Sequence, residues 1–242
     1  MVHPTFPLIG AHTGSGQAPD NTLASFMEGI ESGADVVEVD LRVTRDGTVV
    51  LLHDDTPNLR EWSYEQLNEP ANRIKVDEIY ADHEIATLEQ VLRLAQEHRV
   101  QLNLDIKSGD AVVPTIELVR AIDASGIVFI TGCSEGIAGR YDGIRVVYNT
   151  PDELSEAEWS DYEAWADRQC ELAQDSGAYG LNMDFRTCRP EIVDRAHARG
   201  LAVWVYTVND PAWQRQFADM GVDEITTRAV GTLTQLRSGS AV

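Results

Sequence analysis

Residues 35–53 read DVVEVDLRVTRDGTVVLLH, two runs of β-branched and aliphatic residues joined by a short polar segment. A crossover between parallel strands needs about a dozen residues or more, so this spacing predicts an antiparallel hairpin that turns at Asp46-Gly47. With the turn centred between these two residues, His53 is expected opposite Asp40.

Outward from this hairpin, short continuous apolar runs recur along the whole chain, as is typical of strands buried on both faces of a parallel sheet. The expected strands are Phe6–Ala11, Asp35–Leu41, Thr48–His53, Val100–Ile106, Ile127–Thr131, Arg145–Asn149, Tyr179–Met183, Leu201–Thr207 and Glu224–Thr227. The expected helices between them are Asn21–Ser32, Leu88–His98, Ala111–Ser125, Glu135–Tyr141, Glu153–Ser176, Pro190–Arg199, Pro211–Met220 and Val230–Leu236.

Without the return strand of the hairpin, eight strands alternate with eight helices. This alternation predicts an α/β fold, a (β/α)8 TIM barrel with a hairpin excursion after strand two. A barrel of this kind commonly takes up ~250 residues, so residues 1–242 are expected to form one barrel domain. Residues 54–85 lack clear periodicity and are expected to be a long connection or a small insertion.

The composition is that of a globular protein with a strongly acidic surface. Its 242 residues are 43% hydrophobic and carry a formal net charge of −21. Such a charge repels nucleic acid and anionic lipid, so neither is expected as a partner. No apolar run approaches the ~20 residues of a membrane span, and the first ten residues lack a signal-peptide pattern. We therefore expect a cytoplasmic protein without stable membrane association.

Three cysteines, Cys133, Cys170 and Cys188, are far apart and show no zinc or redox spacing. They are expected to be buried thiols. The sequence yields no prediction of the oligomeric state.

Polar residues collect where the expected strands end, which is the edge that carries the active site in such barrels. Glu38 and Asp40 are two apart on one strand and point to the same face, and Asp105 and Lys107 repeat this spacing on the next strand. Three converging carboxylates repel one another unless a positive charge lies between them. A divalent cation that prefers oxygen ligands, Mg²⁺ or Ca²⁺, is the expected occupant.

Two histidines end expected strands at the same edge, His12 the first strand and His53 the return strand of the hairpin. Histidines on either side of a bound phosphate can act as base and acid, and Lys107 can hold a phosphate oxygen as a point charge. The set is typical of phosphoryl transfer on a small-molecule substrate.

Residues 9–56, IGAHTGSGQAPDNTLASFMEGIESGADVVEVDLRVTRDGTVVLLHDDT, resemble the N-terminal signature of the glycerophosphodiester phosphodiesterases. The shared order is a histidine after strand one, Pro-acid-Asn-Thr, Gly-Ala-Asp, Glu-x-Asp, Asp-Gly and His-Asp. Further on, LNLDIK at 102–107 resembles the metal-and-lysine strand of the family. GLAVWVYTVNDP at 200–211 and MGVDEITT at 220–227 resemble its closing segment.

The resemblance implies metal-dependent cleavage of a glycerophosphodiester into glycerol phosphate and an alcohol, a reaction of lipid metabolism. It implies Glu38, Asp40 and Asp105 as metal ligands, with His12 and His53 as the acid/base pair. It also implies that a hydroxyl of the substrate can attack phosphorus first, forming a cyclic phosphate that water then opens.

The sequence departs from the family pattern at several positions. Thr13 follows the first histidine, where the family has a phosphate-binding arginine, and Asp105 stands where a glutamate is usual. Asp20 replaces the glutamate of the Pro-acid-Asn motif, and Tyr206 is the aromatic residue of the closing segment, expected to contact substrate. Arg228 replaces the aspartate after the last strand. Because the last strand of a closed barrel neighbours the first, we hypothesise that Arg228 restores the phosphate-binding charge missing at Thr13.

Two other functions fit the same residues. One is a related barrel lyase that stops at the cyclic phosphate. The other is a phosphometabolite binder, or an enzyme recruited to different chemistry with reduced diesterase activity. The departures from the family pattern at Thr13 and Tyr206 favour this second alternative.

Overall fold

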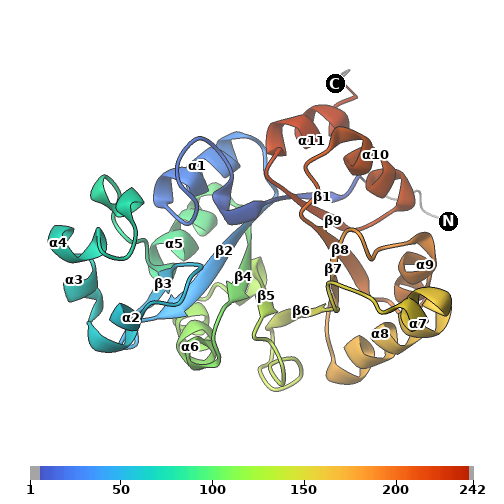
Figure 1. The fold of residues 1–242 in the computed structure, drawn as a ribbon, viewed down its shortest axis with the longest axis horizontal. Coiled ribbons are helices and arrows are strands. Elements are labelled where there is room, and N and C mark those ends of the chain that lie inside the picture. Colours follow the sequence, from blue (N-terminus) through green and yellow to red (C-terminus); the bar gives the residue numbers. More distant parts are fainter. Residues whose placement is uncertain (1–5, 240–242) are drawn as a thin grey trace.

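Eight parallel strands close into a barrel in the computed structural model, which describes residues 6–239 (Figure 1), and this confirms the predicted TIM barrel. The barrel closes because β1 pairs in parallel with both β2 and β9. Its strands are β1 (Leu8–Ala11), β2 (Val36–Val43), β4 (Gln101–Ile106), β5 (Val128–Gly132), β6 (Arg145–Asn149), β7 (Gly180–Asp184), β8 (Ala202–Tyr206) and β9 (Glu224–Thr227).

Long helices cover the outside of the barrel at most of its crossovers. They are α1 (Leu23–Glu31), α5 (Leu88–His98), α6 (Val112–Ala121), α8 (Tyr162–Ser176), α9 (Pro190–Ala198), α10 (Pro211–Met220) and α11 (Val230–Arg237). Short 3₁₀ turns are η1 (His12–Gly14), η2 (Glu78–Ala81), η3 (Gly109–Ala111) and η4 (Ser125–Ile127). Thr22 and Thr87 begin α1 and α5 with capping boxes, which satisfy the free amide groups at the helix starts. No helix among residues 6–239 is long and apolar enough to traverse a bilayer.

Two of the predicted helices differ from the structure. The helix expected over Glu135–Tyr141 is absent, and the chain there forms turns with Gly136 and Gly139 at positive φ, 69° and 73°. Glycine in that conformation ends a helix rather than continuing it. The helix expected over Glu153–Ser176 is two helices, α7 (Glu156–Ser160) and α8, because Asp161 leaves helical geometry and caps α8 with its carboxylate.

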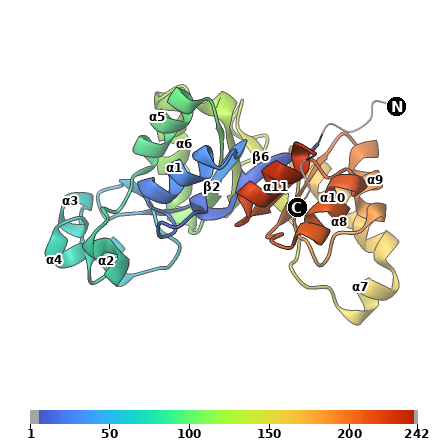
Figure 2. The same cartoon turned by 90° about the horizontal axis from the view of Figure 1, so that it is seen from above.

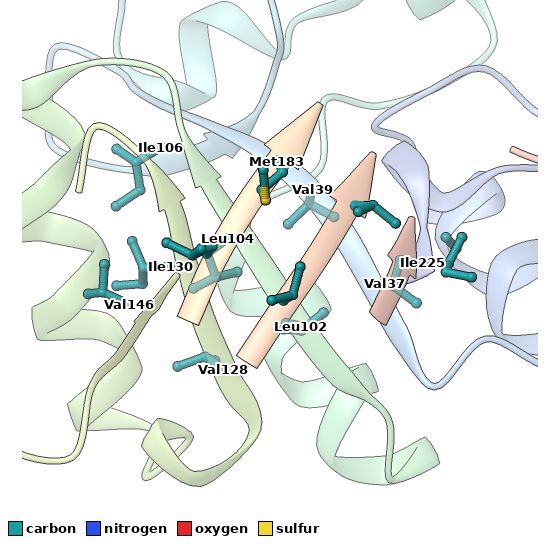
Figure 3. Packing of buried hydrophobic residues seen from close by; sticks show 14 of the residues in the cluster. Val37, Val39, Leu102, Leu104, Ile106, Val128, Ile130, Val146, Met183 and Ile225 are labelled. Carbon is teal, nitrogen blue, oxygen red and sulfur yellow. The ribbon is translucent and has the colours of Figure 1, made fainter. Parts of the chain in front are cut away.

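The main core lies between the strands and the surrounding helices, as the side chains in Figure 3 illustrate. Alternate residues of each strand enter it, since successive side chains of a strand point to opposite faces. The labelled members are Val37, Val39, Leu102, Leu104, Ile106, Val128, Ile130, Val146, Met183 and Ile225. Cys170 and Cys188 are buried as expected, whereas Cys133 is exposed, so that prediction is wrong for Cys133.

The other face of each strand points into the barrel. A small apolar cluster that includes Val36, Phe129, Val147 and Trp204 fills the barrel interior nearer the amino ends of the strands. The centroids of the Phe129 and Trp204 rings are 4.6 Å apart. Towards the carboxyl ends of the strands the inward residues become polar. The barrel interior is therefore packed with apolar side chains near the amino ends of the strands. It is lined by polar side chains at the carboxyl edge, where active sites form.

The hairpin leaves the barrel at β2, whose partner β3 (Val49–Leu51) is antiparallel, as predicted. Gly47 donates its N–H to the Thr44 carbonyl and has φ 86°, so the turn is a three-residue loop closed by a left-handed glycine. Residues 54–85 form an insertion with three short helices that projects from one end of the molecule (Figure 2). These helices are α2 (Pro57–Glu61), α3 (Tyr64–Leu67) and α4 (Pro70–Arg73).

Candidate active site

Three carboxylates meet at the carboxyl edge of β2 and β4. Asp40 and Asp105 are direct neighbours in the parallel register of these strands, and Glu38 lies two residues before Asp40. One oxygen from each of the three lies within 4.8 Å of the others. Burial raises the pKa of Glu38 well above its ordinary value, and the charges of Asp40 and Asp105 raise it further. A third negative charge is therefore costly in this cluster unless a cation lies beside it.

Donors from the β1–α1 loop fix one oxygen of each β2 carboxylate. The Thr13 amide donates to Glu38 Oε2 at 2.7 Å, and the Asn21 side chain donates to Asp40 Oδ2 at 2.7 Å. Asn21 also accepts from the Asp40 amide at 3.0 Å. Thr13 and Asn21 both have positive φ, 53° and 59°, so this loop is bent to face the carboxylates. These donors orient the two acids and leave the second oxygen of each without a contact from this loop, as outer-shell partners do in metal sites.

The sequence pattern assigns Asn21 no functional role. Its only signal is the Pro-acid-Asn-Thr motif, at the start of the expected helix Asn21–Ser32.

Gly132, at the end of β5, leaves the space that Asp105 occupies. A Cβ atom at this position would lie 2.2 Å from Asp105 Oδ1 and 2.3 Å from the Ile106 carbonyl oxygen. Only glycine allows the Asp105 carboxylate to sit against the neighbouring strand, and its φ of 71° also favours glycine.

Lys107 places its ammonium against the same cluster. Its Nζ lies 2.8 Å from Asp40 Oδ1 and 2.6 Å from Asp105 Oδ2. Burial alone would lower the pKa of Lys107, but the two adjacent carboxylates raise it above its ordinary value, so the side chain is charged.

The donor set fits a hard divalent cation. It offers three carboxylates with orienting partners, and none of the three is replaced by a soft ligand such as cysteine or methionine. Mg²⁺ and Ca²⁺ prefer oxygen ligands of this kind.

His12 stands beside the cluster with its two nitrogens in different surroundings. Nδ1 lies 2.9 Å from the Thr207 hydroxyl, and Nε2 lies 4.0 Å from Glu38 Oε2. Burial lowers the pKa of His12, and the positive charge of Arg228 lowers it further. A neutral imidazole fixed through Nδ1 can accept a proton at Nε2. Thr207 directly follows β8 and ends the expected strand Leu201–Thr207, but the strand pattern gives no signal that it contacts His12.

His53 does not lie where the sequence predicted. The hairpin pairs Leu41 with Leu51, so the Leu52 amide bonds to the Asp40 carbonyl and Leu52, not His53, lies opposite Asp40. The three-residue loop shifts the register by one residue. The His53 side chain is 66% exposed and its Nδ1 lies 2.7 Å from Asp54 Oδ1.

The two histidines line different cavities. The His12 cavity, of about 230 Å³, is rich in amide and hydroxyl groups. Its lining is His12, Glu38, Asn103, Asp105, Lys107, Thr131, Asn149, Asp152, Asn182, Tyr206, Thr207 and Thr226. The His53 cavity, of about 330 Å³, lies against the insertion. Its lining is Asp20, Asn21, Leu52, His53, Asp54, Asp55, Thr56, Pro57, Val76, Asp77, Ile79 and Tyr80. The structure therefore places His12 in the same cavity as Glu38 and Asp105, whereas His53 lines the separate cavity beside the insertion, together with Asn21.

Tyr206 and Arg228 are both held by carboxylates. The Tyr206 hydroxyl donates to Asp152 Oδ1 at 2.7 Å, within the His12 cavity. Arg228 forms a two-point ion pair with Asp20 at 2.9 and 2.8 Å, and this bond raises the pKa of the guanidinium above its ordinary value. Asp152 was missed because only the β6–α7 loop brings it near the barrel mouth.

A (β/α)8 barrel with clustered acids, a lysine and a histidine at the carboxyl edge of its strands has the form of a phosphoryl-transfer enzyme. The profile of the glycerophosphoryl diester phosphodiesterase family matches residues 12–232. The chain belongs to this family and is a phosphoric diester hydrolase.

Individual relatives agree with this assignment. A glycerophosphodiester phosphodiesterase of Caldanaerobacter subterraneus subsp. tengcongensis is 28% identical over 243 residues, covering 95% of this chain and 97% of the relative. Among solved structures, an Oleispira antarctica phosphodiesterase in complex with the product sn-glycerol-3-phosphate is similar with a TM-score of 0.77 at 21% identity, covering 97% and 98% of the two chains. The glycerophosphodiester phosphodiesterase of Thermotoga maritima gives 0.74 at 21% identity, covering 95% and 98%. These structures share the fold of this chain.

Proposed function

We propose that this enzyme hydrolyses a glycerophosphodiester to glycerol phosphate and an alcohol, with a divalent cation held by Glu38, Asp40 and Asp105. The observation that carries the proposal is the approach of these three carboxylates to within 4.8 Å at the active edge of the barrel. The relative from Caldanaerobacter and the product bound to the Oleispira enzyme support the substrate class. When bound, Mg²⁺ or Ca²⁺ would polarise a phosphoryl oxygen of the diester.

His12 and His53 act as the acid/base pair in this proposal. One removes a proton from the attacking hydroxyl, and the other gives a proton to the departing alkoxide. Thr207 fixes Nδ1 of His12, so the proton moves at Nε2, which faces the acids. His53 lies on the insertion side, where the second cavity has room for one half of the diester.

Lys107 and Arg228 bind the phosphate, and Tyr206 contacts the substrate in the His12 cavity. Arg228 takes the role of the phosphate-binding arginine that the family has at the position of Thr13. Its positive charge already acts on His12 from the first turn of the chain after β9, which supports its reach into the site. The guanidinium has five N–H donors, and Asp20 accepts from two of them. The remaining donors can bind a phosphate oxygen.

Turnover of a panel of glycerophosphodiesters with Mg²⁺, Ca²⁺, Mn²⁺ or chelator tests the function. We expect release of glycerol phosphate that chelator abolishes and one of the metals restores. Phosphorus NMR of the products separates two mechanisms, because a cyclic phosphate that accumulates indicates the lyase reaction. Metal binding without turnover of any diester would replace the proposal with a phosphometabolite binder.

A further inference from the structure

Lys107 contacts two of the three carboxylates that are proposed to hold a divalent cation. Its Nζ is 2.8 Å from Asp40 Oδ1 and 2.6 Å from Asp105 Oδ2. Metal–oxygen distances for Mg²⁺ and Ca²⁺ are about 2.0–2.6 Å, so a cation on these two oxygens would have to share the space of the ammonium. Two positive charges at that separation repel strongly in a site whose members are largely buried.

Lys107 contacts the Asp40 oxygen that is more open to a cation. Asp40 Oδ2 accepts a hydrogen bond from the Asn21 side chain, so Asp40 Oδ1 has more acceptor capacity left for a metal. That oxygen is the one paired with Lys107. Binding of a cation at Asp40 Oδ1 therefore requires Lys107 to leave.

The displaced side chain has a place to go. Lys107 lines the His12 cavity, and its side chain is 20% exposed, so the ammonium can turn from the acids towards the open space of that cavity. The four-carbon stem of lysine makes this movement easy. The phosphate of a diester bound between His12 and the carboxylates would lie in the same space.

We infer that Lys107 is a built-in counter-ion that occupies the cation site of the metal-free enzyme and exchanges places with the incoming metal. This inference rests on the proposed function only in taking Glu38, Asp40 and Asp105 as the metal site. In the metal-free state Lys107 relieves the repulsion among the three acids. When the metal enters, the ammonium moves to the phosphate subsite, so metal loading and positioning of Lys107 are one step.

A competing internal cation lowers the apparent metal affinity. The apparent Kd equals the intrinsic Kd divided by the fraction of time that the site is open. If Lys107 occupies the site for about nine-tenths of the time, its removal should tighten binding about tenfold. The chain contains only two lysines, Lys75 and Lys107, which gives a matched control. Lys75 lies on the exposed insertion and bonds to Asn72, away from the acids.

The test is calorimetric titration of the metal-free protein with Mg²⁺ and with Ca²⁺. We expect Lys107→Met to bind at least about tenfold more tightly than the unsubstituted protein, while Lys107→Arg, which keeps the charge, and Lys75→Met stay within about twofold of it. An unchanged or weaker affinity in Lys107→Met, with the melting temperature of the metal-bound protein retained, would overturn the inference.

Lysine side-chain NMR gives a second readout on the unsubstituted protein. With two lysines, the ammonium signals are assigned by comparison with Lys75→Met. Saturating Mg²⁺ or Ca²⁺ should move the Lys107 signal and leave that of Lys75 in place. An unmoved Lys107 signal contradicts the exchange even if the Lys107→Met protein fails to fold.

The Asp105→Asn variant separates this inference from the proposed function. If it binds metal as well as the unsubstituted protein does, the proposed cation site itself is wrong. If it loses binding but Lys107→Met shows no gain in affinity, the site stands and only the exchange fails.

Discussion

Arg228 and Asp20, 208 residues apart, form a two-point ion pair with N–O distances of 2.9 and 2.8 Å. Arg228 follows the last strand of the barrel and Asp20 lies in the loop after the first, so closure of the sheet through β1 and β9 brings them together. Both positions depart from the family pattern described above, and the two departures form one contact.

We expect Arg228→Ala to lower kcat/KM by about 10- to 100-fold, mainly through a higher KM. A charge-assisted hydrogen bond contributes about 1.5–3 kcal/mol, and the variant loses one to the substrate phosphate. Arg228→Lys keeps the positive charge but loses the two-point geometry of the guanidinium. Its kcat/KM should lie between those of the unsubstituted protein and Arg228→Ala. Steady-state kinetics on a cleaved glycerophosphodiester measure the effect, and Asp20→Asn is the control that removes the pair but keeps the guanidinium. Unchanged kcat and KM in Arg228→Ala would refute the phosphate-binding role.

The histidines give a second prediction. His12→Ala and His53→Ala should each lower kcat by about 10²-fold or more, because each loses a proton transfer in the reaction. His83→Ala, on the insertion, is the control histidine and should keep near-normal turnover. A near-normal rate in either of the first two variants removes that residue from the acid/base pair.

The barrel could be predicted from sequence because strand and helix periods differ clearly and the connections are short. The errors arise where one residue changes the geometry. Gly136 and Gly139 break a stretch whose composition is otherwise helical, and the left-handed Gly47 adds one residue to a turn that looked like a two-residue loop. Since side chains alternate along a strand, that single residue moved His53 off its predicted partner.

The candidate site divides in the same way. Glu38, Asp40 and Asp105 could be predicted to meet, because strand spacing and parallel register determine their positions. Asn21, which donates to Asp40, and Asp152, which accepts from Tyr206, come from loops, whose paths over the barrel mouth leave no periodic signal in the sequence. Thr207, which contacts His12, lies at the end of an expected strand, but the strand pattern does not indicate its partner.

A third prediction concerns the conflict between stability and function at Glu38. Glu38→Gln should abolish metal-dependent activity yet raise the melting temperature of the metal-free protein by about 2–4 °C, the shift expected for about 1 kcal/mol in a chain of this size. Glutamine keeps an oxygen for the Thr13 amide and cannot ionise, so it avoids the cost of a charge that burial, Asp40 and Asp105 all oppose. Thermal melts after removal of metal, with exposed Glu31→Gln as control, measure this. A lower melting temperature would show that Lys107 already neutralises the cluster in full.

The last prediction concerns Glu224, which is buried inside the barrel and accepts hydrogen bonds from the Thr226 hydroxyl at 2.9 and 3.1 Å. Burial raises its pKa well above the ordinary value, although the bond from Thr226 opposes the shift. The folded protein therefore holds a proton that the unfolded chain releases at lower pH, so stability falls as the pH rises from about 4.5 towards the raised pKa.

Glu224→Gln, which cannot ionise, should lose this part of the pH dependence and become more stable than the unsubstituted protein at the alkaline end. Urea unfolding from pH 5 to pH 9 measures the difference, with the exposed Glu117→Gln as a control for the loss of one charge. A stability difference between Glu224→Gln and the unsubstituted protein that stays constant over this range would show that Glu224 does not change its protonation on unfolding. Its burial beside Gly10, where a Cβ atom would lie 1.7 Å from Oε1, would then have to be explained by packing alone.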